Sequence, residues 1–176
     1  MRRILLLLSL VVLPVAAAQP KPILACPMAD GTKVILLAQS HGLDGKSLLL
    51  KVDGKTTPAF QDMPDTEFVG EVVLAKCANR AMVFALNYGP PYLKGVALRK
   101  NPVSHAKERI YFAEKALPRW LYTSDEEMLI VIPNVGLETD RKYLVYRYDA
   151  GRGQPVESSA ENARPSVTNH AVTEIH

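Results

Sequence analysis

The sequence predicts an all-β protein: a single antiparallel β-sandwich or barrel of about eight or nine short strands, followed by a disordered C-terminal tail. Three observations lead to this prediction. Side chains alternate with a period of two in runs such as Ala81–Tyr88, which is typical of a strand. Turn dipeptides recur between the apolar runs. No amphipathic helical pattern of useful length is present, and these patterns do not distinguish a barrel from a sandwich.

The chain begins with a segment typical of a secretory signal peptide. Met1–Arg3 is basic, Ile4–Val15 is apolar, and Ala16–Ala18 supply the small residues that precede a cleavage site. We therefore expect cleavage near Ala18 and a mature chain that is periplasmic or secreted. The apolar run is shorter than the roughly 20 residues that span a bilayer, so we expect no transmembrane segment in the mature chain.

Charge and length limit the partners of the mature chain. Loss of residues 1–18 removes Arg2 and Arg3 and lowers the formal charge from +3 to +1. The remaining basic residues are scattered, so nothing indicates a nucleic-acid partner. We expect residues 19–150 to form one β domain whose partner is a protein or another ligand of the cell envelope.

Cys26 and Cys77 are the two cysteines of the chain. In an exported protein they most simply form one disulfide. This bond would stabilise the fold by about 4 kcal/mol in the chain-entropy model. The alternative is that Ile23–Cys26 is a lipoprotein processing box and that Cys26 carries a lipid anchor.

The strongest strand signal is in the middle of the chain. In Ala81–Tyr88 the large side chains of Met82, Phe84 and Leu86 alternate with smaller ones, and Gly89 followed by prolines ends the run. Asp53-Gly54 predicts a type I′ hairpin turn, and Pro58 predicts that the strand after this turn lies at an edge. The expected strands are Lys33–Ala38, Lys46–Val52, Lys55–Phe60, Phe68–Ala75, Ala81–Tyr88, Tyr92–Leu98, Trp120–Thr123, Met128–Ile132 and Lys142–Tyr148.

Two segments are harder to assign. Residues 108–117 fit either a strand around Arg109–Ala113 or a short helix, and Pro118 ends either one. Residues 151–176 hold only four aliphatic residues beyond alanine. We expect this segment to be a disordered tail, since it offers little apolar surface to offset the entropy of ordering.

No catalytic motif is found. The chain lacks the nucleophile-elbow, zinc-protease, P-loop and dinucleotide signatures. We therefore expect no catalytic residues, no metal and no cofactor. The favoured function is a non-enzymatic binding or inhibitor-like module of the cell envelope. The alternatives are a structural or assembly component that pairs through an edge strand, and a hydrolase of unrecognised type.

The opening of the mature chain resembles one known family. Cys26, the segment Asp30–Val34 (DGTKV) and the segment Val52–Thr56 (VDGKT) are similar to the start of the periplasmic inhibitors of C-type lysozyme, which are small β-barrels. The likeness covers about thirty residues. The inhibitory Ser-Gly-x-x-Tyr loop of that family is absent, and 99 residues follow Cys77. No inhibitory residue is carried over.

A binding surface is predicted on two strands near the end of the chain. Trp120, Tyr143 and Arg147 are of the residue types that dominate protein interfaces. Alternation places Tyr143 and Arg147 on the outside of their strand if Leu144 faces the core. If these residues are not the contact surface, the loops around His41 and Pro90 are the next candidates.

Overall fold

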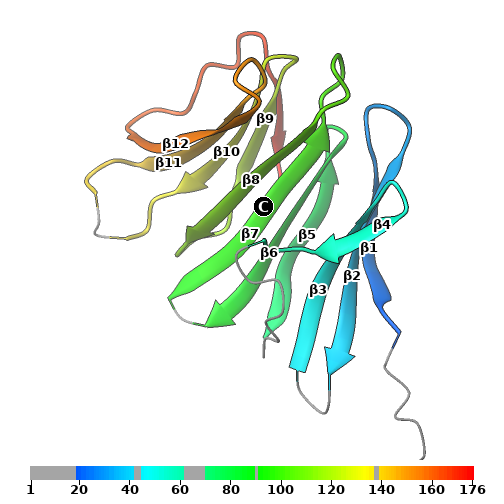
Figure 1. Ribbon diagram of the computed structural model, residues 1–176. Helices are drawn as coiled ribbons and strands as arrows, with labels where there is room; N and C mark the ends of the chain where they lie inside the picture. Colours follow the sequence, from blue (N-terminus) through cyan, green and yellow to red (C-terminus); the bar gives the residue numbers. More distant parts are fainter. Residues whose placement is uncertain (1–18, 42–44, 62–69, 90, 137–138) are drawn as a thin grey trace, which may run out of the picture.

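The computed structural model describes residues 19–41, 45–61, 70–89, 91–136 and 139–176. These residues form thirteen strands and no helix (Figure 1), so no helix there could cross a membrane. The strands are β1 (Lys21–Pro27), β2 (Lys33–His41), β3 (Gly45–Val52), β4 (Lys55–Pro58), β5 (Glu71–Ala78), β6 (Ala81–Gly89), β7 (Tyr92–Lys100), β8 (Lys107–Glu114), β9 (Trp120–Thr123), β10 (Glu127–Pro133), β11 (Tyr143–Asp149), β12 (Gln154–Glu161) and β13 (Ala171–Glu174).

The all-β prediction is confirmed, but the single sandwich or barrel is replaced by three antiparallel sheets. The N-terminal sheet has the order β1-β2-β3-β4, the central sheet β5-β6-β7-β8, and the C-terminal sheet β12-β11-β10-β9-β13. Figure 1 shows the central sheet between the other two. In the segment 108–117, for which the sequence allowed a strand or a short helix, residues 108–114 belong to strand β8. The Asp53-Gly54 turn has the positive φ angles of 51° and 78° that a type I′ turn requires.

Strand β6 is buried on both faces, so the central sheet has another sheet packed on each side. Its large residues, Met82, Phe84 and Leu86, pack in a first core against the N-terminal sheet. Its small residues on the opposite face, such as Ala81 and Ala85, are equally buried, in a second core against the C-terminal sheet. Small side chains on this face leave room for large partners from the C-terminal sheet, so both faces of the central sheet are packed.

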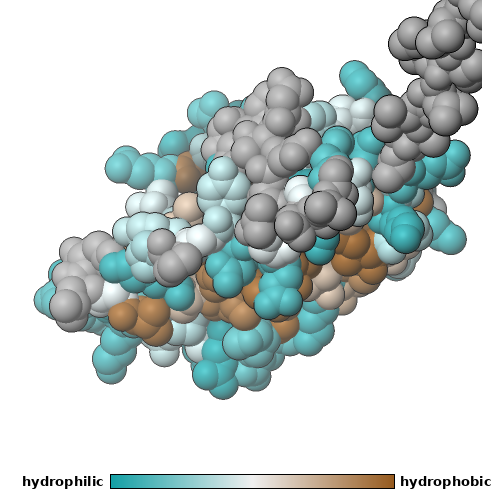
Figure 2. All heavy atoms as spheres, turned by 90° about the horizontal axis from the view of Figure 1, so that it is seen from below, coloured by the Kyte–Doolittle hydropathy of each residue, from teal (hydrophilic) through white to brown (hydrophobic). Residues whose placement is uncertain are grey.

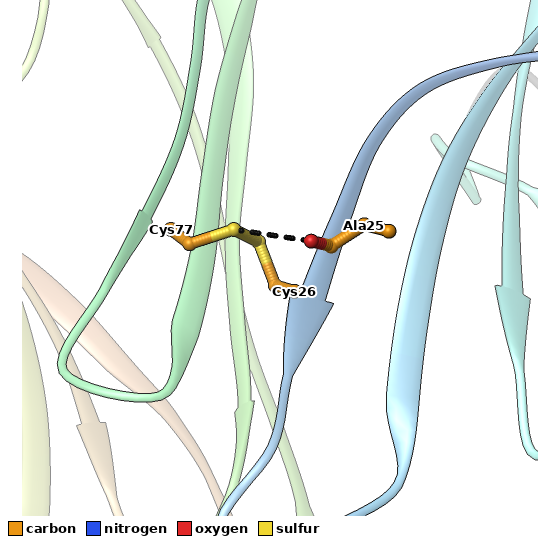
Figure 3. The surroundings of a disulfide bond; sticks show 3 residues. All are labelled: Ala25, Cys26 and Cys77. Carbon is orange, nitrogen blue, oxygen red and sulfur yellow. Dashed lines mark hydrogen bonds between the residues drawn. A yellow bond between two sulfur atoms is a disulfide. The ribbon is translucent and has the colours of Figure 1, made fainter.

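The disulfide between Cys26 and Cys77 is present, as predicted, and joins β1 to β5 (Figure 3). Its Cα atoms are 5.5 Å apart. Sγ of Cys77 lies 3.5 Å from the carbonyl oxygen of Ala25, the contact drawn in Figure 3. Because a disulfide sulfur carries no proton, this is a van der Waals contact. The bridge therefore fastens the edge of the N-terminal sheet to the edge of the central one.

A row of polar residues at the end of β7 joins all three sheets. Lys100 points toward the N-terminal sheet, where its Nζ donates to Asp30 at 2.6 Å and to Asp53 at 2.7 Å. These two carboxylates belong to the turns after β1 and β3. The hydrogen bond from Lys100 is the main reason why the pKa of each aspartate is held below its usual range.

The neighbours of Lys100 point the other way. Arg99 and Asn101 both donate to the buried carboxylate of Glu108. Each also donates to a backbone carbonyl near the start of β10, in the C-terminal sheet. The two carbonyls belong to Asp125 and Glu127. Alternation along one strand thus sends successive side chains to opposite layers. Arg99, Lys100 and Asn101 are thus each hydrogen-bonded to a neighbouring sheet, while Glu108 is satisfied by Arg99 and Asn101.

The expectation of a disordered tail at 151–176 is corrected. Strands β12 and β13 pair with β11 and β9, at opposite edges of the C-terminal sheet. Residues 162–170 connect them across the outer face of that sheet, where Arg164 lies 4.6 Å from the ring of Trp120. Ile175 is 2% exposed and closes the second core. Edge pairing uses backbone hydrogen bonds, so a segment poor in apolar residues can still be ordered.

Candidate binding groove along strand β8

Strand β8 is one edge of the central sheet, and its register defines which backbone groups face outward. Antiparallel pairs alternate between hydrogen-bonded and non-hydrogen-bonded positions. The backbone N–H of Asn101 donates to the carbonyl oxygen of Ala106 at 2.9 Å, and these two residues lie opposite each other in the register of β7 and β8. The hydrogen-bonded positions then recur at every second residue, so the backbones of residues 108, 110 and 112 bond to β7. Residues 107, 109, 111 and 113 then direct their N–H and C=O groups away from the sheet. The backbone N–H of Ala113 accordingly lies near the phenol oxygen of Tyr146, where it opposes the rise in the pKa of that phenol.

The side chains of β8 also alternate between the two neighbouring layers. Ile110 and Phe112 are buried in the second core, whereas Tyr111 packs against the first core. Lys107 and Arg109 share the face of Tyr111, because residues two apart lie on one side of a strand. The residues whose backbone faces outward are therefore the ones whose side chains point toward the N-terminal sheet.

Two cavities follow this face of β8. The first has a volume of about 370 Å³ and lies between β8 and β4, the edge of the N-terminal sheet. Its described lining residues include three cations, Lys55, Lys107 and Arg109, and no carboxylate. The described residues that line it are Val52, Lys55, Thr57, Pro58, Gln61, Lys107 and Arg109.

The second cavity, of about 480 Å³, is aromatic. Tyr88 and Tyr92, which are 43% and 45% exposed, reach it from β6 and β7. Tyr111 and Phe112 come from opposite faces of β8, so the cavity reaches around the open edge of that strand. The described residues that line it are Tyr88, Gly89, Tyr92, Lys94, Tyr111, Phe112, Ala113 and Tyr146.

Arg109 of the first cavity contacts Tyr111 of the second, and we call the two neighbouring cavities together the β8 groove. The guanidinium of Arg109 donates to the hydroxyl of Tyr111 at 2.8 Å, and its Cζ lies 5.7 Å from the ring centroid. The groove therefore has a basic end and an aromatic end, with an arginine on an aromatic ring between them. Viewed from below, hydrophobic residues form a band across the end of the molecule, bordered by hydrophilic ones (Figure 2).

Among the described residues, acidic groups lie near both ends of the groove. Asp53 contacts Lys107 at 3.1 Å, but it also binds Lys100 at 2.7 Å. Asp53 is thus shared between two ammonium groups, and Lys100 is in turn shared between Asp53 and Asp30. These four charges balance, so the positive charge of the basic end comes mainly from Lys55 and Arg109. At the aromatic end, burial and a hydrogen bond to Glu114 raise the pKa of Tyr146. Its phenol stays neutral, and the carboxylate of Glu114 is an acidic group at this end of the groove.

The residues predicted as a binding surface lie elsewhere, on the outer face of the C-terminal sheet. The structure brings Trp120 and Tyr143 together, with ring centroids 5.8 Å apart. Arg147 shares this face, as alternation predicted, and binds Glu127 at 2.7 Å. Trp120 also has the guanidinium groups of Arg119 and Arg164 at 5.0 and 4.6 Å. These side chains are already occupied by partners within the chain, and a role for them in binding stays a prediction.

The groove was missed in the sequence because its residues come from separate strands. One local signal was present: Lys107, Arg109 and Tyr111 alternate with residues that the structure buries. The uncertainty between strand and helix at 108–117 hid that alternation. The loop around Pro90, the second choice from sequence, is flanked by Tyr88 and Tyr92 of the aromatic end. Position 90 itself lies outside the described residues.

No group of three or more potential metal ligands occurs among the described residues. Comparison with known proteins finds no matching family model, no matching curated protein and no matching solved structure.

Proposed function

We propose that this protein is a non-enzymatic binding protein of an exported compartment, and that its ligand is an anion held in the β8 groove. The observation that carries the proposal is the pair of neighbouring cavities along β8, with Lys55, Lys107 and Arg109 at one end and exposed tyrosines at the other. Cations attract and orient an anionic group, while tyrosine rings offer apolar area with a polar tip.

The chemistry of the lining favours binding over catalysis. Arginine does not give up its proton in proteins, and the guanidinium of Arg109 is engaged with Tyr111. The hydroxyl and amide groups of Thr57 and Gln61 add hydrogen bonds. Such a set can recognise a carboxylate or a sulfate by charge and geometry, but it offers no pair of groups suited to acid and base steps.

The disulfide is compatible with the oxidising compartment that the N-terminal sequence predicts. A Cys26 sulfur bonded to Cys77 cannot also carry a lipid. We therefore propose export after cleavage near Ala18, with no lipid anchor at Cys26. The partner would be a protein or another ligand of the cell envelope.

Calorimetric titration with two polyanions, polyglutamate and a sulfated oligosaccharide, tests the proposed site. The double variant Lys107→Gln/Arg109→Gln should weaken binding of at least one of them about tenfold or more, because two charge-assisted contacts are lost. Arg141→Gln is the control, since the guanidinium of this exposed arginine lies outside the groove and pairs with its neighbour Asp140 at 3.5 Å. Equal affinities for the wild type and the double variant would contradict the proposal.

A further inference from the structure

We infer that the ligand of the β8 groove is an extended, acidic polypeptide segment that adds to the central sheet as a fifth strand beside β8. This inference rests on the proposed function and specifies its ligand. It combines two features of the same residues. Lys107, Arg109 and Tyr111 direct their backbone groups away from the sheet, and their side chains line the groove.

The backbone of β8 supplies the pairing surface. From residue 107 to residue 111 the strand spans about 13 Å, and three residues on this stretch have outward N–H and C=O groups. A strand laid antiparallel beside them would exchange two hydrogen bonds with each. Main-chain pairing of this kind gives affinity, and the side-chain pockets along it give specificity.

Other sheet edges among the described residues are less suited to accept a strand. Proline cannot donate to a ladder and marks protected edges; β1, β4 and β12 all contain it. Strand β13 has only four residues, and β5 is fastened to β1 by the disulfide. Strand β8 has eight residues and no proline.

The positive side chains of β8 favour an acidic partner over a second copy of this chain. A second copy of β8, paired antiparallel, would bring its own Lys107 and Arg109 near the same two cations, and like charges across a strand pair are destabilising. Lysine and arginine on an edge thus discourage self-association. An acidic segment reverses the sign of this interaction, because its carboxylates would lie opposite Lys107 and Arg109 and within reach of Lys55.

The register predicts a sequence pattern for the segment. Directly opposed residues in an antiparallel pair share one face. Acidic residues should therefore lie opposite Arg109 and Lys107, with an aromatic residue opposite Tyr111. A blocked peptide Tyr-Val-Glu-Val-Glu meets this pattern when it runs antiparallel to β8. Its tyrosine and glutamates would pair with β8 through the backbone, while the N–H groups of its valines would point outward.

The test measures the dissociation constant of this peptide and the hydrogen exchange of the full protein with and without it. N-methylation of the two glutamates should weaken binding about tenfold or more, because it removes donors to β8. N-methylation of the two valines should change it less than about threefold, since those groups face away. The amides of Arg109 and Tyr111 should become protected, and Lys107→Gln/Arg109→Gln should remove this protection.

Several results would overturn the inference. These are equal losses from the two methylated peptides, protection confined to other strands, or no binding of the parent peptide up to about 1 mM. If the peptide fails while a sulfated oligosaccharide binds and depends on Lys107 and Arg109, the polypeptide ligand is wrong but the proposed anion site stands. If no polyanion depends on these two residues, both proposals fail.

Discussion

Replacing Gly95 with alanine should destabilise the protein and disturb the groove at the same time. A Cβ atom at residue 95 would lie 2.1 Å from Cζ of Phe112 and 2.7 Å from the backbone oxygen of Phe84. Ordinary contact begins at 3.4 Å, so the Phe112 ring would have to retreat by about 1.3 Å. That ring is 3% exposed and packs edge-on against Tyr146, which lines the aromatic end of the groove.

The expected magnitude follows from overpacking. Inserting a methyl group into a filled core usually costs 1–3 kcal/mol, and the backbone contact to Phe84 places this case near the upper end, at about 2–3 kcal/mol. Denaturant unfolding measures the loss directly. Gly151→Ala is the control, because its Cβ would meet only the flexible side chain of Asp149, at 3.2 Å. It should change stability by less than about 0.5 kcal/mol.

A double-mutant cycle separates the clash from a general intolerance of Gly95. If the methyl group collides with the Phe112 ring, Gly95→Ala should cost less in a Phe112→Ala background than in the wild type. Additive losses would refute the close packing of Gly95 beneath Phe112. An unchanged free energy of unfolding in Gly95→Ala would refute it as well.

Three further predictions concern the contacts between sheets and the strands at the C-terminal end. Lys100 lowers the pKa of Asp30, so the stabilisation from this pair is complete above the unfolded aspartate pKa of about 4 and is lost as the pH falls below it. Lys100→Met should therefore be less stable than the wild type at pH 7, and its free energy of unfolding should change less between pH 4 and 2. A constant difference between the two proteins over this pH range would contradict the prediction. Removing the Cys26–Cys77 bridge in the double serine variant should cost about 4 kcal/mol; unchanged denaturation, or two free thiols in the wild type by mass spectrometry, would contradict its role. A chain ending at Gly151 should melt many degrees lower because it loses β12 and β13, whereas an unchanged melting temperature would mean that these strands do not stabilise the sheet.

Local periodicity predicted much of the fold. The alternation of Met82, Phe84 and Leu86 identified a strand and its large face, and Asp53-Gly54 identified a hairpin. The third layer was not predicted, because alanines at 81 and 85 do not indicate whether their face is covered. Their burial depends on side chains of β9, β10 and β11 and on Ile175, which is information the local pattern does not contain.

The tail and the groove were missed for a related reason. Hydrophobic content is a poor guide to strands at a sheet edge, whose order comes from backbone pairing with a neighbour. Residues 154–161 and 171–174 are of this kind. The groove brings Lys55 near Lys107 and Arg109, from the edges of two different sheets. The outward placement of Tyr143 and Arg147 was predictable, since it depends on alternation within one strand.

Backbone amide NMR during a polyglutamate titration tests the central claim most directly, because it compares the two candidate faces in one experiment. The groove predicts that the largest shift changes fall on residues 107–113 and 55–58, with little change at Trp120, Tyr143 and Arg147. Shifts that centre on Trp120, Tyr143 and Arg147, and leave β8 unchanged, would contradict the account and place the binding surface on the outer face of the C-terminal sheet.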